Sequence, residues 1–189
     1  MSKQKKSGSA IFMDCVIALT FVSSIVCFVL YYANIVRSSV VLWAGITVFT
    51  ILYHFGLRIF FGEVTKRFNI RYTGWWFKER RYEKKLYDFL RVKKWKDKVL
   101  TYDPAAFSME NHTLEEIANT MSKAETDHWI NEIISITTIF FSLIWGELWI
   151  LLTTAILAML FDAQFIIIQR YNRPRVVKAI ERQNSKKTA

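Results

Sequence analysis

Residues 40–61 read VVLWAGITVFTILYHFGLRIFF, an apolar run that only His54 and Arg58 interrupt with ionisable groups. About 20 mainly apolar residues are needed for a helix that crosses a hydrocarbon core of roughly 30 Å. Three further runs have a similar character, at residues 11–33, 129–145 and 148–168. The sequence therefore predicts an all-α integral membrane protein with four transmembrane helices.

The charges indicate how such a protein is oriented. The chain is 52% hydrophobic with a net charge of +10, and its charged residues lie almost wholly outside the four runs. Lys and Arg are enriched in short cytoplasmic loops. They precede the first run, and they are frequent in 62–128 and after 168, whereas Arg37 alone lies between the first two runs. We expect a multi-pass protein of the cell membrane with both termini in the cytoplasm.

This orientation divides the chain into five parts. A tail of residues 1–10 precedes a first transmembrane hairpin at 11–61, and a second hairpin occupies 129–168. Between them lies a basic, aromatic-rich cytoplasmic region at 62–128, and a basic tail follows at 169–189. Proline disfavours helix in the residue before it. We therefore expect the last transmembrane helix to end before Pro174, and both extremities of the chain to be weakly ordered.

The region 62–128 is too long for a loop without structure of its own, so we expect two or three interfacial helices in it. Aromatic and basic residues alternate from 75 to 99, a pattern typical of a helix in the headgroup layer. Candidate contacts to phosphate there are Arg80, Lys94, Trp95 and Lys96. A second helix is expected over 108–121, with Asn111 or Thr113 as its N-cap.

Polar side chains recur at the cytoplasmic ends of the apolar runs. Ionisable groups inside a membrane are costly, so each one is a candidate functional residue. Several share a helical face through their spacing. These pairs are His54 with Arg58, Glu125 with His128, and Asp162 with Gln169. Glu125 could hold one ring nitrogen of His128, which would leave the other nitrogen to act as a base.

Two other interpretations of these polar residues stay open. They could form a structural network of ion pairs, for example between Arg58 and Asp162. They could also form a metal site from His54, His128, Glu125 and Asp162, but di-iron bundles use two Glu-x-x-His pairs and this chain has one. We expect no metal, no cofactor and no nucleic acid as a partner.

Five segments resemble the family of small bacterial membrane proteins named after glycosyl-4,4'-diaponeurosporenoate acyltransferase. The resemblance covers roughly residues 53–175. The matching segments are FKERRYEKKLY (77–87), VKKWKDKV (92–99), TYDP (101–104), AETDHW (124–129) and IQRYNRPR (168–175). The chain departs from the family pattern at Tyr82, at 99–100 and at 126–127.

The resemblance implies a membrane O-acyltransferase that moves a fatty acyl group onto a hydroxyl of a glycolipid or lipid-linked acceptor. His128 would then be the general base and Glu125 its orienting partner. Substrate would contact His54, Arg58, Asp162, Gln169, Arg170, Asn172 and Arg173. The expected partners are membrane lipids and an acyl donor, which could be acyl-CoA, acyl carrier protein or a phospholipid. The alternative is a non-enzymatic lipid-binding or accessory subunit with a structural polar cluster.

Overall fold

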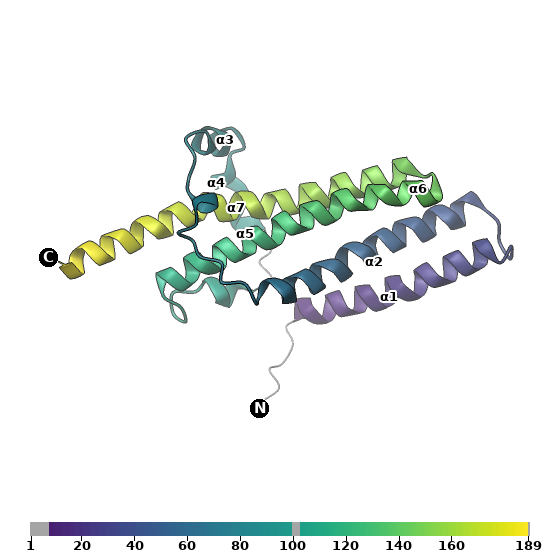
Figure 1. The fold of residues 1–189 in the computed structure, drawn as a ribbon, viewed down its shortest axis with the longest axis horizontal. Helices are drawn as coiled ribbons and strands as arrows, with labels where there is room; N and C mark the ends of the chain where they lie inside the picture. The colour runs from purple at the N-terminus through teal and green to yellow at the C-terminus, as the bar shows by residue number, and fades with distance from the viewer. Residues whose placement is uncertain (1–7, 100–102, 189) are drawn as a thin grey trace, which may run out of the picture. The chain divides into compact units, whose positions relative to one another are not determined.

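The computed structural model describes residues 8–99 and 103–188, and the described residues form helices and turns with no strand among them (Figure 1). The long helices are α1 (Gly8–Tyr32), α2 (Ser39–Thr65), α5 (Leu114–Thr137) and α7 (Leu148–Thr188). Short α-helices are α3 (Glu83–Phe89), α4 (Val92–Trp95) and α6 (Ser142–Trp145). Short 3-10 helices are η1 (Trp75–Phe77), η2 (Lys96–Lys98), η3 (Pro104–Phe107) and η4 (Thr138–Phe141). The all-helical fold class is confirmed.

Three helices of the described chain are long and apolar enough to cross a membrane, rather than the four predicted. They are α1 from Ile11, α2 and α7. The run at 129–145 is divided among the end of α5, η4 and α6, so no single helix carries it. The first half of α5 is charged, with Glu115, Glu116, Lys123 and Glu125 among its residues. The prediction of a fourth transmembrane helix was therefore wrong.

Helix α7 runs on through Pro174 for 41 residues, so the predicted end of this helix before Pro174 was also wrong. A proline inside a helix removes one backbone hydrogen bond and usually kinks the helix. The neighbouring Arg173 is held by side-chain contacts to Glu125 and to the Phe77 carbonyl, which fix the backbone at this point. The predicted basic tail at 169–189 is thus helical to residue 188.

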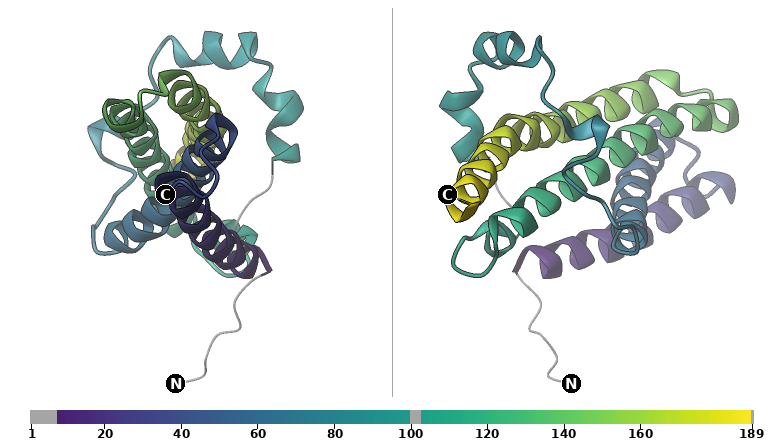
Figure 2. Two further views of the ribbon diagram at one scale, coloured as in Figure 1. Left: turned by 90° about the vertical axis from the view of Figure 1, so that its right-hand side faces the viewer. Right: turned by 60° about the vertical axis from the view of Figure 1, so that its left-hand side comes forward.

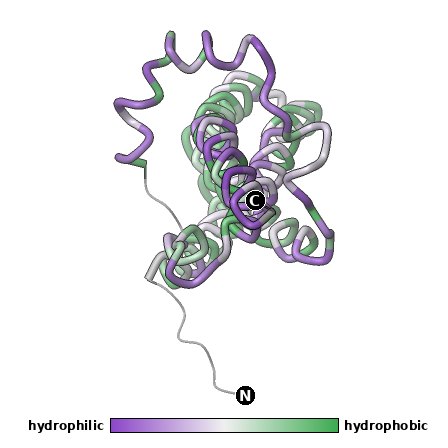
Figure 3. Tube along the Cα trace, turned by 90° about the vertical axis from the view of Figure 1, so that its left-hand side faces the viewer, coloured by the Kyte–Doolittle hydropathy of each residue, from purple (hydrophilic) through white to green (hydrophobic). Residues whose placement is uncertain are grey.

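The region 62–128 is more broken than the predicted interfacial helix over 75–99. α3 ends at Phe89, and Arg91 has a left-handed backbone with φ of 51° before α4 begins. Figure 2 shows α3 and α4 as an arch on the outside of α5 and α7. Most of the arch is hydrophilic (Figure 3), although the Phe89 side chain is 82% exposed. Contact of this segment with a membrane remains a prediction.

Helix α5 begins directly after Thr113, which is one of the two predicted N-caps, and not at residue 108 where the predicted helix began. The Glu116 amide donates to Thr113 Oγ1 at 3.2 Å, and the Thr113 amide donates to Glu116 Oε2 at 2.8 Å. This reciprocal pair is a capping box, which satisfies two donors at the helix start. The hydrogen bonds from the Thr113 backbone and side chain lower the pKa of the Glu116 carboxyl. Residues 101–102 of the TYDP segment and residues 1–7 of the predicted tail lie outside the described residues.

The described chain divides into two compact units. The first unit contains the residues up to Glu63 together with Asn131–Leu160. Its buried core is formed by Leu42, Ile46, Ile150 and Leu151. Aromatic rings pack against this core, with the Phe28 ring stacked on Trp145 at 5.3 Å and Phe49 edge-on to Phe141 at 5.1 Å. The first unit is therefore held mainly by apolar and aromatic packing.

The second unit contains Val64–Ile130 together with the residues from Phe161 onward. Its apolar core includes Val92, Ile117, Ala118, Met121 and Ile166. Its interior also holds many charged side chains. The buried ones are Glu83, Glu125, Asp162, Arg170 and Arg173. Burial of a charge is costly unless the charge is paired. The second unit is therefore the candidate location of a polar functional site.

Helices α1 and α2 of the first unit approach each other closely at Gly45. A Cβ atom built there would lie 3.1 Å from Cys27 Cβ and 3.2 Å from a Phe28 ring carbon, whereas at Gly56 it would meet nothing within 4 Å. Overpacking of this kind costs about 1–3 kcal/mol. We predict that Gly45→Leu lowers the melting temperature of the purified protein, because the two helices must move apart.

Gly56→Leu is the matched control on the same helix. Leucine favours a helix by up to about 1 kcal/mol over glycine, so this variant should melt at or slightly above the wild-type temperature. Equal melting temperatures for the two leucine variants would contradict the close approach at Gly45.

Candidate functional site

Glu125 lies at the centre of the charged interior of the second unit. Its Oε1 atom accepts a hydrogen bond from Arg170 Nη1 at 2.7 Å, and its Oε2 atom accepts one from Arg173 Nη1 at 2.5 Å. Its side chain is fully buried and that of Arg173 is only 2% exposed. The predicted contact of Glu125 with His128 is thus corrected, because both carboxylate oxygens of Glu125 face arginines from α7.

A second carboxylate completes this arrangement. Glu83 at the start of α3 accepts from Arg170 Nε at 3.1 Å, and the Glu83 Oε1 atom lies 2.9 Å from Arg170 Nη2. We call Glu83, Glu125, Arg170 and Arg173 the buried ion network. It contains two carboxylates and two guanidiniums, so their charges balance. Interior ion pairing, one of the interpretations that the sequence left open, is present among these four residues.

Backbone carbonyl oxygens accept further hydrogen bonds from the two arginines. Arg170 Nη2 donates to the Trp76 carbonyl at 3.1 Å, and Arg173 Nη2 donates to the Phe77 carbonyl at 3.0 Å. The Arg173 guanidinium also lies 4.9 Å from the centroid of the Phe77 ring, a cation–π distance. The planar fork of arginine suits such multiple contacts. The network therefore ties η1 and α3 to α7.

Tyr87 extends the network at α3. Its hydroxyl donates to Glu83 Oε2 at 2.9 Å, one helical turn away. Burial raises the pKa of the Tyr87 hydroxyl above its ordinary value, and the hydrogen bond to Glu83 raises it further. Tyr87 is therefore a neutral donor at physiological pH, which satisfies the second oxygen of Glu83.

His128 lies one turn after Glu125 on α5 and has a different partner. Its Nδ1 atom is 2.7 Å from Asp162 Oδ1 on α7, and Asp162 is fully buried. An ionised carboxylate only accepts hydrogen bonds, so with Asp162 ionised Nδ1 would be the donor, and a neutral imidazole would then present Nε2 as an acceptor. We call these residues the His128–Asp162 pair.

One face of the His128 imidazole is covered by an aromatic ring. The His128 ring lies parallel to the Phe165 ring, with centroids 4.7 Å apart and an interplanar angle of 4°. The His128 side chain is 22% exposed. Within the described part of the chain its Nε2 atom has no hydrogen-bond partner. An oriented, partly accessible imidazole with one free acceptor nitrogen has the geometry of a general base.

The remaining predicted site residues are distributed over both units. His54 is buried and Arg58 half-buried on α2 in the first unit. Gln169 and Asn172 are half-buried on α7 in the second unit. In the described residues no group of three or more His, Cys, Asp and Glu side chains is placed to hold a metal ion.

The predicted phosphate contacts lie in the arch or directly beside it in the chain. The Arg80 guanidinium is 5.4 Å from the centroid of the Trp76 ring, and Lys94 is exposed. Trp95 Nε1 donates to the Leu90 carbonyl at 3.0 Å, and Lys96 pairs with Asp97 at 2.5 Å. Arg80 and Lys94 are therefore the more accessible cations of this group.

Sequence reasoning missed Glu83 and the carbonyls of Trp76 and Phe77. The spacing of Glu83 and Tyr87 by four residues is a signal that they share a helical face. Nothing in the local sequence indicates that the same carboxylate meets Arg170, which is 87 positions away in the chain.

The comparison with known families bears on all of these residues. The model of the glycosyl-4,4'-diaponeurosporenoate acyltransferase family matches residues 73–182, more than half of the chain. The chain belongs to this family. The match includes both the buried ion network and the His128–Asp162 pair, which are therefore part of the family domain. No curated protein and no solved structure matches the chain.

In this member of the glycosyl-4,4'-diaponeurosporenoate acyltransferase family, the buried ion network should contribute to the free energy of unfolding. Removing one partner of a buried ion pair costs about 3–5 kcal/mol, because the other charge is left uncompensated. We predict that Glu125→Gln destabilises the protein by an amount in this range, measured by denaturation in detergent.

Glu115→Gln is the matched control, because it is the same change at an exposed position of the same helix. A carboxylate in the first turn of an exposed helix contributes about 0.3–1 kcal/mol. If Glu125→Gln lowers the unfolding free energy by no more than this smaller amount, the network does not hold the second unit together.

Proposed function

We propose that this protein is a membrane O-acyltransferase in which the His128–Asp162 pair supplies the general base. It would move a fatty acyl group onto a hydroxyl of a glycolipid or other lipid-linked acceptor. The observation that carries the proposal is the 2.7 Å contact of His128 Nδ1 with the buried Asp162, which leaves Nε2 as the acceptor. Membership of an acyltransferase family supports the reaction class.

The proposed reaction uses His128 twice. Nε2 removes the proton of the acceptor hydroxyl as its oxygen attacks the carbonyl carbon of the acyl donor. The resulting tetrahedral oxyanion then collapses, the bond to the leaving group breaks, and the imidazolium returns the proton to that group. Asp162 stabilises the imidazolium and keeps the ring in the productive tautomer, as the aspartate does in the Ser-His-Asp triad.

The buried ion network has a supporting role in this proposal. Arg170 and Arg173 direct their donors at Glu83, Glu125 and backbone carbonyls. We therefore assign them to holding α5 against α7, so that His128 and Asp162 meet, instead of to binding the donor. In this proposal Asp162 contacts the base His128 directly. Glu125 has no contact with the base and instead holds Arg170 and Arg173 in place.

We also propose that the site works at the cytoplasmic leaflet. Lys3, Lys5 and Lys6 precede α1 and the basic residues of 62–128 follow α2, so the positive-inside rule favours the cytoplasmic side for both. Fatty acyl donors such as acyl-CoA are made on that side. The three apolar helices would hold the protein in the cell membrane.

A second candidate is a non-enzymatic lipid-binding or accessory subunit. The balanced, wholly internal pairing of the buried ion network favours it, because such a network needs no substrate to be satisfied. The two candidates differ at His128. An accessory subunit has no use for a free Nε2 atom, whereas acyl transfer requires it.

Lipid mass spectrometry on cells with and without the protein tests this proposal. We predict a glycolipid that gains one fatty acyl mass when the wild-type protein is present. Positioned proton transfer contributes about 10² to 10⁴ in rate, so His128→Ala should reduce the product at least 100-fold, and Asp162→Asn should also reduce it strongly.

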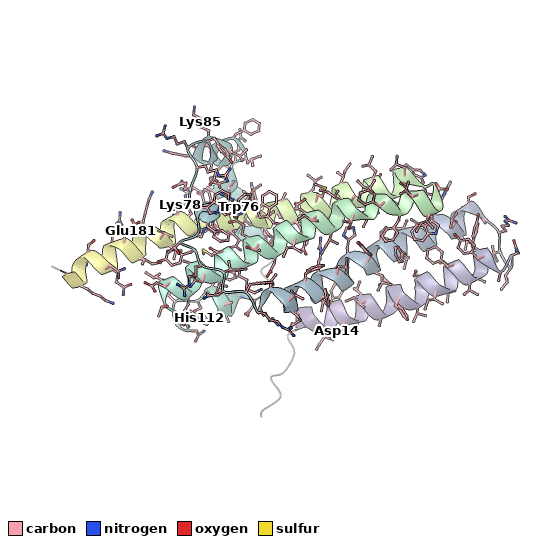
Figure 4. The ribbon with its side chains drawn as sticks, in the orientation of Figure 1. Asp14, Trp76, Lys78, Lys85, His112 and Glu181 are labelled. Atoms are coloured by element: carbon pink, nitrogen blue, oxygen red, sulfur yellow. The ribbon has the colours of Figure 1, made fainter. Side chains whose placement is uncertain are left out.

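His112→Ala is the matched control, because His112 is an exposed histidine before α5 (Figure 4). It should leave the acylated lipid at the wild-type level. Undiminished product in a folded His128→Ala protein would remove His128 as the base, and identical lipid profiles with and without the wild-type protein would favour the accessory subunit.

A further inference from the structure

The second unit contains a pocket of about 640 Å³ that the proposed chemistry does not use. One wall is the segment from Tyr72 to Glu79, and the other is the part of α7 that follows Arg173. Lys78 from the first wall and Glu181 from the second are seen in Figure 4. Pockets for small molecules and cofactors are usually about 300–1,000 Å³, so this one is large enough for a ligand.

Charged side chains of both signs line the pocket. Lys78 and Glu79 come from the first wall, and Lys178 and Glu181 come from α7. All four side chains are exposed. None of them forms an ion pair with another described residue, in contrast to Arg173 at the same pocket. These four charges are therefore available to a ligand.

This combination of groups suits a nucleoside phosphate better than a bare phosphate. Lysines are common phosphate ligands, and carboxylates accept hydrogen bonds from ribose hydroxyls. The half-buried rings of Tyr72 and Phe77 also line the pocket and offer faces on which a base can stack. A phosphate alone would gain from the lysines but would be repelled by Glu79 and Glu181.

The position of the pocket on α7 restricts the kind of acyl donor further. Lys178 follows Asp162 by sixteen residues, which is roughly 24 Å along a helix at about 1.5 Å per residue. In a phospholipid only the glycerol carbons separate the phosphate from the acyl ester, so its phosphate would stay close to His128. A coenzyme A thioester instead places a long pantetheine arm between its nucleotide and its acyl group.

We propose that this pocket binds the adenosine phosphate end of an acyl-coenzyme A donor, whose pantetheine arm carries the thioester toward His128. This proposal rests on the acyl transfer proposed above. Lys78 and Lys178 contact the phosphates, Glu79 and Glu181 contact the ribose hydroxyls or the amino group of adenine, and an aromatic ring carries the base. The leaving group of the reaction is then the coenzyme A thiol.

Binding of adenosine 3',5'-bisphosphate to the purified full-length protein tests the pocket without any need for activity. Titration calorimetry should detect binding by the wild type and, with the same dissociation constant, by His128→Ala. The double variant Lys78→Gln, Lys178→Gln should bind at least 10-fold more weakly, because it loses both cations that face the phosphates.

The double variant Lys84→Gln, Lys85→Gln is the matched control, since it removes the same charge from exposed positions of α3. It should bind as the wild type does. Absence of bisphosphate binding by the wild type, or equal weakening by both double variants, overturns the proposed pocket. Binding of acyl carrier protein without binding of the bisphosphate also overturns it, in favour of a carrier-bound thioester.

The outcomes for the pocket and for the reaction are distinguishable. Loss of the acylated lipid in His128→Ala with intact bisphosphate binding supports both proposals. Bisphosphate binding by a wild-type protein that produces no acylated lipid would refute acyl transfer and leave a nucleotide site. An acylated lipid made by a protein that does not bind the bisphosphate would refute the pocket alone.

Discussion

The second unit depends on one carboxylate, Glu125, which is shared by two arginines in a buried environment. Because an isolated buried charge is costly, neither Arg170 nor Arg173 can leave Glu125 without a large loss of stability. This constraint fixes the register of α5 against α7. Glu125 and His128 are one turn apart on α5, so the same register brings His128 to Asp162 on α7.

The network also explains two features of the chain that are unusual in isolation. Helix α7 continues through Pro174, where the adjacent Arg173 is held at both Glu125 and the Phe77 carbonyl. The segment before α3 has little regular structure, yet the carbonyls of Trp76 and Phe77 are placed by the two arginines. Buried ion networks are weak evidence for net stability, but they can make one packing arrangement preferable to its alternatives. Here they select one arrangement of α3, α5, η1 and α7.

In the functional proposals, α7 acts as the common scaffold. It carries Asp162, which orients the proposed base, and it carries Lys178 and Glu181 of the proposed donor pocket. The separation between Asp162, which orients the base, and Lys178 is then set by one helix. Sites built on rigid elements hold their geometry better than sites built on loops.

The sequence alone determined the helical class and the apolar helices α1, α2 and α7, and it offered Thr113 as one of two N-caps for α5, because hydrophobic runs and capping residues are local signals. It also placed Glu125, His128 and Asp162 among the important residues. Only the tertiary structure decided that Glu125 meets the arginines and that Asp162 meets His128. Helical spacing tells which residues share a face, whereas the partner on another helix depends on a packing register set by contacts between residues far apart in the chain.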